Sequence, residues 1–247
     1  VQTKLENRLP EAGNVTLKTL IYNPENQLVA EKNTLHTIRA GEKIDYQQNL
    51  EVEYPNLWSI EAPHLYKAVS EVYDKEGELK DSYETIFGIR TFRFDSLKGF
   101  FLNDQHIKLL GVCMHHDLGC LGAAVNTRAI ERQLEILKEM GCNSIRTSHN
   151  PPAPELLELC DKMGFVVQNE TFDMWRKKKT EFDYSRYFPE WHERDLTDHI
   201  LRDRNHPSVM MWSIGNEVLE QWQDVKADTL NIQQANLLLN FEKNILR

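Results

Sequence analysis

The chain has 247 residues, enough for one large domain or two domains of ordinary size. Its hydrophobic content of 40% and charged content of 27% are typical of globular proteins, and no apolar run approaches the roughly 20 residues that a membrane-spanning helix needs. The net charge is −9, and Lys and Arg cluster only at residues 176–179, so neither a nucleic acid nor a membrane is expected as a partner.

The four cysteines show no metal-binding pattern. None is spaced as Cys-x-x-Cys, and no paired histidines accompany them: Cys113, Cys120, Cys142 and Cys160. Free thiols are therefore expected in place of a zinc site. The sequence begins at Val1 without a methionine, and we expect its natural start to lie upstream, so neither a cytoplasmic nor a periplasmic location is favoured.

The first 93 residues show the pattern of a small β-domain. Apolar and polar residues alternate in short segments, and turn signals such as Asn23-Pro24 separate them. The predicted strands are residues 15–21, 28–38, 43–52 and 65–73. We therefore predict an immunoglobulin-like β-sandwich over residues 1–93. Trp58 and Tyr66 lie in a Pro-containing connection and are expected in its core, without a catalytic role.

Strands and helices alternate over residues 94–247. Asn103-Asp104 predicts a hairpin turn, and Asn126 or Thr127 predicts a helix N-cap. The predicted strands are residues 107–112, 144–146, 165–167 and 209–214. The first predicted helix ends at Gly141, the second ends at Gly164, and the third spans residues 191–202. The last predicted helix carries Leu230, Leu237, Leu238, Phe241 and Ile245. This alternation implies parallel strands with right-handed crossovers. Because a complete (β/α)₈ TIM barrel takes about 250 residues, we predict its first four βα units, with an open four-stranded α/β layer as the alternative.

Polar and aromatic residues follow each predicted barrel strand. In chain order they are His115, His116 and Asp117; Arg146 to Asn150; Asn169, Glu170, Asp173 and Trp175; and Asn216 and Glu217. The carboxyl ends of parallel strands meet at one edge, so these groups are expected to share a rim. Hydrogen-bonding groups beside aromatic rings suit a sugar, which has hydroxyls and apolar C–H faces.

Several of these residues have a simpler explanation. His115 and His116 point to opposite faces of an extended backbone, so a shared metal ion is not expected. Arg146 is expected to pair with a carboxylate such as Glu170 and to support Glu217. Trp175 fits a core position and a binding wall equally well.

The segment that contains the fourth strand resembles the acid/base segment of glycoside hydrolase family 2, the family of β-galactosidases and β-glucuronidases. The matching residues, in order, are Asn205, Pro207, Trp212, Gly215, Asn216 and Glu217. Residues 143–149 resemble the family's other diagnostic segment, and residues 56–66 resemble a segment of its sandwich domain. The resemblance is weak in the sandwich and strong in the barrel.

The resemblance implies roles for individual residues. Glu217 would be the catalytic general acid/base; Arg146 and Asp173 are expected, apart from the resemblance, to support it. His115, His149 and Asn216 would bind the sugar, the last at its 2-hydroxyl. The chain departs from the family where Cys113 replaces Asn, Asn169 replaces Asp, and Met174 stands in place of a magnesium-ligating Glu. No cofactor is therefore expected, magnesium included.

The function implied is that of a retaining β-glycosidase acting on a β-linked saccharide. A β-galactosidase is favoured; the alternatives are a β-glucuronidase, a β-mannosidase, or a non-catalytic carbohydrate-binding module. In this family the nucleophile lies on a later barrel strand, so the chain alone is expected to be inactive. A half-barrel leaves strand edges unpaired, which predicts self-association or a disordered rim.

Overall fold

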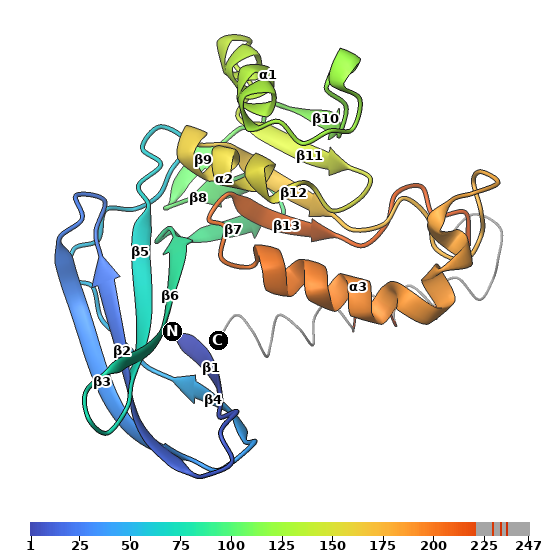
Figure 1. Ribbon diagram of the computed structural model, residues 1–247. Coiled ribbons are helices and arrows are strands. Elements are labelled where there is room, and N and C mark those ends of the chain that lie inside the picture. Colours follow the sequence, from blue (N-terminus) through green and yellow to red (C-terminus); the bar gives the residue numbers. More distant parts are fainter. Residues whose placement is uncertain (221–228, 230–232, 234–235, 237–247) are drawn as a thin grey trace. The chain divides into compact units, whose positions relative to one another are not determined.

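The computed structural model describes residues 1–220, 229, 233 and 236 (Figure 1). The chain divides into two compact units, Val1–Arg90 and Thr91–Arg247. The division precedes the predicted one at residue 93 because β7 (Phe92–Asp95) pairs with β8 (Gly99–Leu102) in the second unit. The predicted last helix, with Leu230 and Leu237, lies outside the described residues. In the described part, no helix is long and apolar enough to cross a membrane.

The first unit is the expected immunoglobulin-like β-sandwich. Its strands are β1 (Gln2–Glu6), β2 (Gly13–Tyr22), β3 (Leu28–Ile38), β4 (Lys43–Gln47), β5 (Tyr66–Tyr73) and β6 (Leu79–Phe87). One sheet has the order β3-β2-β5-β6 and the other pairs β1 with β4, all antiparallel. The sequence pattern missed β1 because Leu5 is its one large apolar residue, and it missed β6 because most residues of that strand are exposed.

The sandwich core contains both aromatic residues of the Pro-containing connection. Trp58 is 0% exposed, and its main-chain N–H donates to Ile89 O at 2.8 Å. Tyr66 is buried, and its hydroxyl accepts a hydrogen bond from Asn56 N at 2.8 Å. The predicted packing role of the two side chains is confirmed.

The second unit contains the first half of a TIM barrel. A small antiparallel sheet of β7, β8 and β9 (Gln105–Ile107) precedes it, with the predicted hairpin turn at Asn103-Asp104. The barrel elements are β10 (Gly111–His115), α1 (Thr127–Glu139), β11 (Ser144–Ser148), α2 (Pro154–Met163), β12 (Val166–Glu170), α3 (Phe188–Asp203) and β13 (Val209–Ser213), with 3₁₀ turns η1 (Gly119–Leu121) and η2 (Tyr184–Arg186). Strands β10 to β13 are parallel and adjacent in chain order, and their arrowheads point the same way in Figure 1.

The first barrel strand was misplaced by the sequence pattern. The predicted strand at residues 107–112 is wrong, because Ile107 ends β9 and β10 begins at Gly111. A Cβ atom at Gly111 would lie 2.6 Å from Ser144 O, so only glycine permits the close approach of β10 to β11. Strands β11 and β12 extend past their predicted ends, through Ser148 and Glu170. Their terminal side chains, Ser148 and Glu170, have hydrogen-bond partners and can therefore stay in the sheet.

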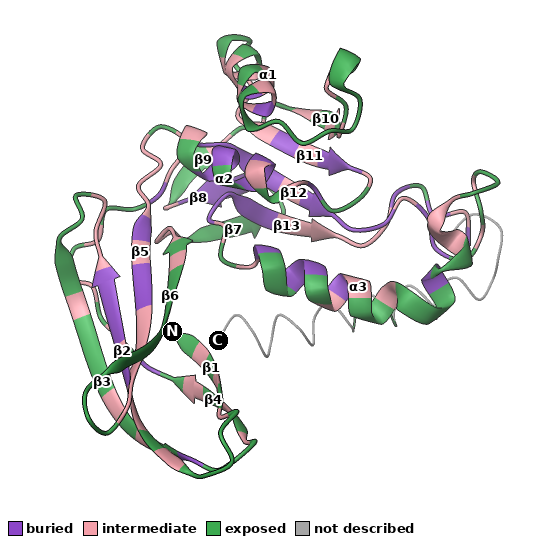
Figure 2. Ribbon diagram, in the orientation of Figure 1, coloured by how far each residue is buried: buried purple, intermediate pink, exposed green. Residues whose placement is uncertain are grey.

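Helices pack on this sheet through two apolar clusters. Side chains of α1 and α2, including Leu134 and Leu157, pack with Ile145, Val167 and Val209 of the strands. The helix starts and ends follow the predicted signals: Asn126 Oδ1 accepts a hydrogen bond from Ala129 N at 3.0 Å, and Gly164 adopts the left-handed conformation after α2. In Figure 2, β12 is buried over most of its length, whereas α3 has a buried and an exposed face.

A buried polar network joins α3 to β12. His199 Nε2 lies 3.1 Å from Asn169 Oδ1, and Asn169 Nδ2 donates to Asp203 Oδ2 at 2.9 Å. Burial lowers the pKa of His199. Burial would raise the pKa of Asp203, but hydrogen bonds from Arg202 and His199 outweigh it and hold this pKa well below its ordinary value.

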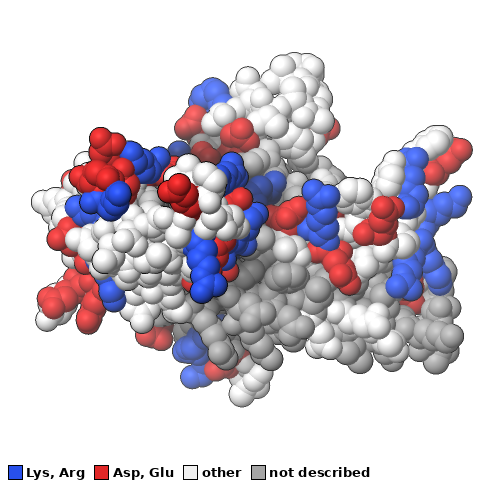
Figure 3. All heavy atoms as spheres, turned by 60° about the horizontal axis from the view of Figure 1, so that its bottom comes forward, with Lys and Arg blue, Asp and Glu red and all other residues white. Residues whose placement is uncertain are grey.

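Surface charges of opposite sign lie close together. On the face shown in Figure 3, Lys and Arg side chains lie among Asp and Glu side chains. Lys80 contacts Asp74 and Glu78 at 2.7 Å, and Arg128 contacts Glu131 at 2.9 Å. The expectations about nucleic acid, membranes and self-association remain predictions.

Candidate active site

The ends of β11, β12 and β13 bring several predicted site residues to one rim. Glu170 is paired with Ser213 across β12 and β13, and His115 with Ser148 across β10 and β11. His149 directly follows β11, and Asn216 follows β13 by three residues. The shared rim expected from parallel strands is therefore present.

Glu170 lies at the centre of the rim and is 0% exposed. Arg146 Nη2 donates to both carboxylate oxygens, at 3.0 and 2.8 Å, and Arg146 Nε donates to Oε2 at 3.2 Å. Ser213 Oγ donates to the same Oε2 at 2.6 Å. Burial opposes the charge of Arg146, but the hydrogen bonds to Glu170 outweigh it and raise the pKa of the guanidinium. The predicted contact of Arg146 with Glu170 is confirmed.

His149 is oriented by the same carboxylate. Its Nδ1 lies 2.6 Å from Glu170 Oε1. Because Nδ1 faces the carboxylate, Nε2 is the ring nitrogen left to meet a substrate hydroxyl. The His115 ring lies edge-on to the His149 ring at 5.1 Å, so the two predicted sugar-binding histidines are neighbours.

The Asn216 side chain is held by groups from two other strand ends. Its Oδ1 accepts a hydrogen bond from Arg146 Nη2 at 2.8 Å, and its Nδ2 donates to Asp173 Oδ1 at 2.9 Å. The same Asp173 oxygen accepts a hydrogen bond from Lys179 Nζ at 2.8 Å. Partial burial would raise the pKa of Asp173, but the hydrogen bonds from Lys179 and Asn216 outweigh it and keep that pKa below its ordinary value.

Glu217 and Trp175 lie in different environments. Glu217 is exposed and has a φ of +42°, a left-handed conformation that is uncommon outside glycine. Trp175 is 1% exposed, and its indole N–H donates to Ile214 O at 2.8 Å. This burial corresponds to the core alternative for Trp175 and not to a sugar-binding wall.

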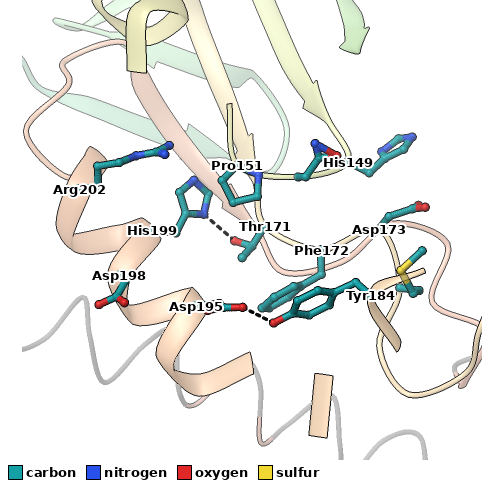
Figure 4. Close-up of a pocket in the computed structure, with 12 residues that line it drawn as sticks. His149, Pro151, Thr171, Phe172, Asp173, Tyr184, Asp195, Asp198, His199 and Arg202 are labelled. Atoms are coloured by element: carbon teal, nitrogen blue, oxygen red, sulfur yellow. Dashed lines mark hydrogen bonds between the residues drawn. The ribbon is translucent and has the colours of Figure 1, made fainter. Parts of the chain in front are cut away.

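A cavity of about 520 Å³ opens beside this network (Figure 4). His149 and Asp173 form part of its lining, together with Phe172, Tyr184 and the polar side chains of α3. The Phe172 and Tyr184 rings stack at 5.5 Å. This volume is in the range of small-molecule sites, which run from about 300 to 1,000 Å³.

Two models of one protein family match most of the chain. Residues 95–236 match the family model described as "Glycosyl hydrolases family 2, TIM barrel domain", and residues 1–90 match "Glycosyl hydrolases family 2". The chain belongs to glycosyl hydrolase family 2.

Its similarity to individual proteins covers between 68% and 97% of the chain. Beta-galactosidase BoGH2A of Bacteroides ovatus is 62% identical over 239 residues, which are 97% of this chain and 28% of that protein. A putative beta-glucuronidase of Formosa agariphila is 44% identical over 169 residues, which are 68% of this chain and 16% of that protein. The structure of a family 2 member from Bacteroides cellulosilyticus has a TM-score of 0.92 and 40% identity, and covers 97% of this chain and 31% of that one. The chain spans less than a third of the length of these relatives.

The surroundings of Asn169 and Met174 bear on two departures from the family pattern that the resemblance implies. Asn169 donates to the buried Asp203, so an aspartate in its place would put two carboxylates in contact. Met174 is buried, and a thioether is a poor magnesium ligand. Within the described residues, no group of three or more His, Cys, Asp or Glu is placed to hold a metal ion. The absence of a cofactor remains a prediction.

Sequence reasoning missed Ser213 and Lys179. Ser213 ends an apolar strand, and only its pairing with Glu170 shows that its hydroxyl faces the carboxylate. Lys179 lies in a run of four basic residues, and no periodicity distinguishes it from Lys178. Its spacing of six residues from Asp173 could have suggested a loop contact but not its geometry.

Proposed function

We propose that this chain forms part of a retaining β-glycosidase in which Glu217 is the general acid/base. The observation that carries the proposal is the placement of Asn216 and Glu217 directly beyond β13, on the rim that also holds His149. In barrel enzymes the catalytic residues come from the carboxyl ends of the strands. The Asn216 amide has its orientation fixed on both sides and can meet a sugar hydroxyl beside the acid.

The proposed reaction needs two carboxyl groups about 5–5.5 Å apart. Glu217 protonates the leaving oxygen and then activates water, while the nucleophile attacks the anomeric carbon. Glu170 is unsuited to attack because it is fully buried and both its oxygens accept hydrogen bonds. The resemblance puts the nucleophile on a later strand, so residues 1–247 alone are expected to be inactive.

A β-galactoside is the favoured substrate. The relative at 62% identity is named a beta-galactosidase, whereas the one at 44% is named a putative beta-glucuronidase. A β-glucuronidase is the second candidate because several relatives carry that name.

The test is hydrolysis of nitrophenyl β-galactoside, β-glucuronide and β-mannoside by the full-length protein and by residues 1–247. We expect the full-length protein to prefer the galactoside, with retention of configuration by NMR, and Glu217→Gln to lower kcat by about 10²–10⁴-fold. Wild-type rates in Glu217→Gln would contradict the proposal. Sugar binding without any hydrolysis would indicate a carbohydrate-binding module.

A further inference from the structure

Lys179 contacts the segment that carries Glu217. Its ammonium group donates to the main-chain oxygen of Asn216 at 2.9 Å and to Asp173 Oδ1 at 2.8 Å. The Lys179 side chain is only 18% exposed, whereas Lys178 beside it is exposed. An ammonium withdrawn from water needs such acceptors, so its position is fixed.

The oxygen that Lys179 holds belongs to the peptide bond between Asn216 and Glu217. The plane of that peptide bond is the reference for the φ of Glu217, which is +42°. Non-glycine residues keep a left-handed backbone where the surroundings hold it, and this is frequent at active sites. Lys179 supplies that constraint at the peptide adjoining Glu217.

The rest of the acid-bearing turn, residues 214–217, is held by the same loop, residues 172–179. Trp175 Nε1 donates to Ile214 O, and Asn216 N donates to Phe172 O at 2.9 Å. The loop is itself anchored, because Lys179 N donates to Asp183 Oδ2 at 2.6 Å. Lys179 is the member of this set whose side chain reaches both the peptide bond of the acid and the carboxylate that orients Asn216.

We propose that Lys179 is a positioning residue for the general acid/base. It holds the peptide bond between Asn216 and Glu217 and the Asp173 carboxylate, so that the Glu217 carboxyl meets the leaving oxygen. This inference rests on the proposed function, in which Glu217 donates that proton. Lys179 itself does not touch the substrate.

The test compares two leaving groups in the full-length protein. The methanol of a methyl glycoside must be protonated as it leaves, whereas dinitrophenolate leaves without protonation. In the second step of the reaction, added azide replaces the water that a general base must activate. We expect Lys179→Met to lower kcat about 10²-fold on the methyl glycoside, with far smaller losses on the dinitrophenyl glycoside when azide is present. KM should change little, and Lys179→Arg should recover part of the rate because it restores a cation.

Two variants calibrate this comparison. Lys178→Met removes an exposed neighbouring charge and should behave as wild type, and Glu217→Gln should show the same leaving-group selectivity as Lys179→Met, more strongly. Equal losses on both substrates in Lys179→Met, with selective losses in Glu217→Gln, would overturn the role of Lys179 alone. An unaffected Glu217→Gln would overturn the proposed function together with this inference. Thermal unfolding of Lys179→Met and Lys179→Arg identifies any loss that is due to misfolding.

Discussion

Both units of the molecule bury polar side chains, among them Gln48 in the sandwich and Glu170 in the barrel. Gln48 uses neutral partners: its Oε1 accepts a hydrogen bond from Thr19 Oγ1 at 2.5 Å, and its Nε2 donates to Thr34 Oγ1 at 2.9 Å. Glu170 uses Arg146, His149 and Ser213. Both side chains have their hydrogen-bond partners, but only Glu170 has a charged partner, Arg146.

This difference in partners distinguishes Gln48, which contributes to the fold, from Glu170, which also orients residues of the candidate site. A buried amide needs only hydrogen bonds, which the strands around Gln48 supply locally. A buried carboxylate costs far more to desolvate and needs a cation. The cation here, Arg146, also reaches Asn216, so the charge on Glu170 fixes a residue that a substrate can meet.

The largest effect is expected from Glu170→Gln, which keeps the shape of the side chain and removes its charge. Arg146 would lose its anion in a half-buried position, which should lower the free energy of unfolding by about 3 kcal/mol. One of the two acceptor oxygens would become an amide NH₂ that faces a donor, either His149 at Oε1 or Ser213 at Oε2, so the rim should be displaced and kcat of the full-length protein should fall about 10²-fold. Urea denaturation and steady-state kinetics measure the two effects.

Glu135→Gln is the matched control for Glu170→Gln. Glu135 also forms a two-pronged pair with an arginine, Arg128, at 2.9 Å for each contact, but on the exposed face of α1. Exposed pairs add little to stability, so this variant should unfold and react like the wild type. Equal destabilisation by the two variants would show that burial is not what distinguishes Glu170.

Gly215→Ala should have the next largest effect. The added Cβ would lie 2.6 Å from Val218 Cγ2 and 2.9 Å from Trp175 Nε1, so the acid-bearing turn or the indole must shift. Overpacking of this kind costs about 2 kcal/mol, and moving the turn should lower kcat more than it raises KM. Gly13 is the control, because no atom lies within 4 Å of a Cβ built there. Wild-type kcat in Gly215→Ala would show that the turn tolerates displacement.

Local patterns predicted most of the fold because caps, turns and alternation act within a few residues. Strand β3 was predicted with both of its bounds, and Asn126 caps α1 as expected. The error at β10 has a non-local cause: whether Ile107 continues into the barrel depends on its pairing with Phe100 in β8. The same limit explains β6, which is held by pairing with β5 and not by its own pattern.

The candidate site was predictable where chain order fixes neighbours. Adjacent parallel strands put Arg146 and Glu170 within reach, and that contact is confirmed. The position of Trp175 could not be derived, because the loop after β12 has no regular spacing and its path depends on the cluster around Phe188.

Gln48→Leu tests the buried amide of the sandwich and should have a smaller effect than Glu170→Gln or Gly215→Ala. It leaves the Thr19 hydroxyl, which is 0% exposed, without its acceptor, at a cost of about 1.5 kcal/mol. Adding Thr19→Val should recover much of the loss, since replacing both partners by apolar groups can be nearly neutral. No recovery in the double variant would show that Gln48 acts through other contacts.

The smallest effect is expected from His206→Gln, because His206 pairs with the buried Asp161 just before β13, at the opposite end of that strand from the rim. His206 Nδ1 lies 2.5 Å from Asp161 Oδ2, and Asp161 Oδ1 accepts a hydrogen bond from Ser208 N just before the strand. Burial would lower the pKa of His206, but the hydrogen bond and charge of Asp161 outweigh it and raise that pKa.

A raised pKa means that the folded protein binds the His206 proton more tightly than the unfolded chain does. The resulting stability is complete below the unfolded pKa of about 6.5 and is lost as the pH rises through the folded pKa. We expect His206→Gln to cost about 1 kcal/mol near pH 6 and progressively less in alkaline solution, as measured by urea denaturation. Parallel pH profiles for the two proteins would contradict this assignment. Unlike Glu170→Gln, the variant should leave kcat unchanged, because this ion pair lies where a barrel strand begins and supports only the fold.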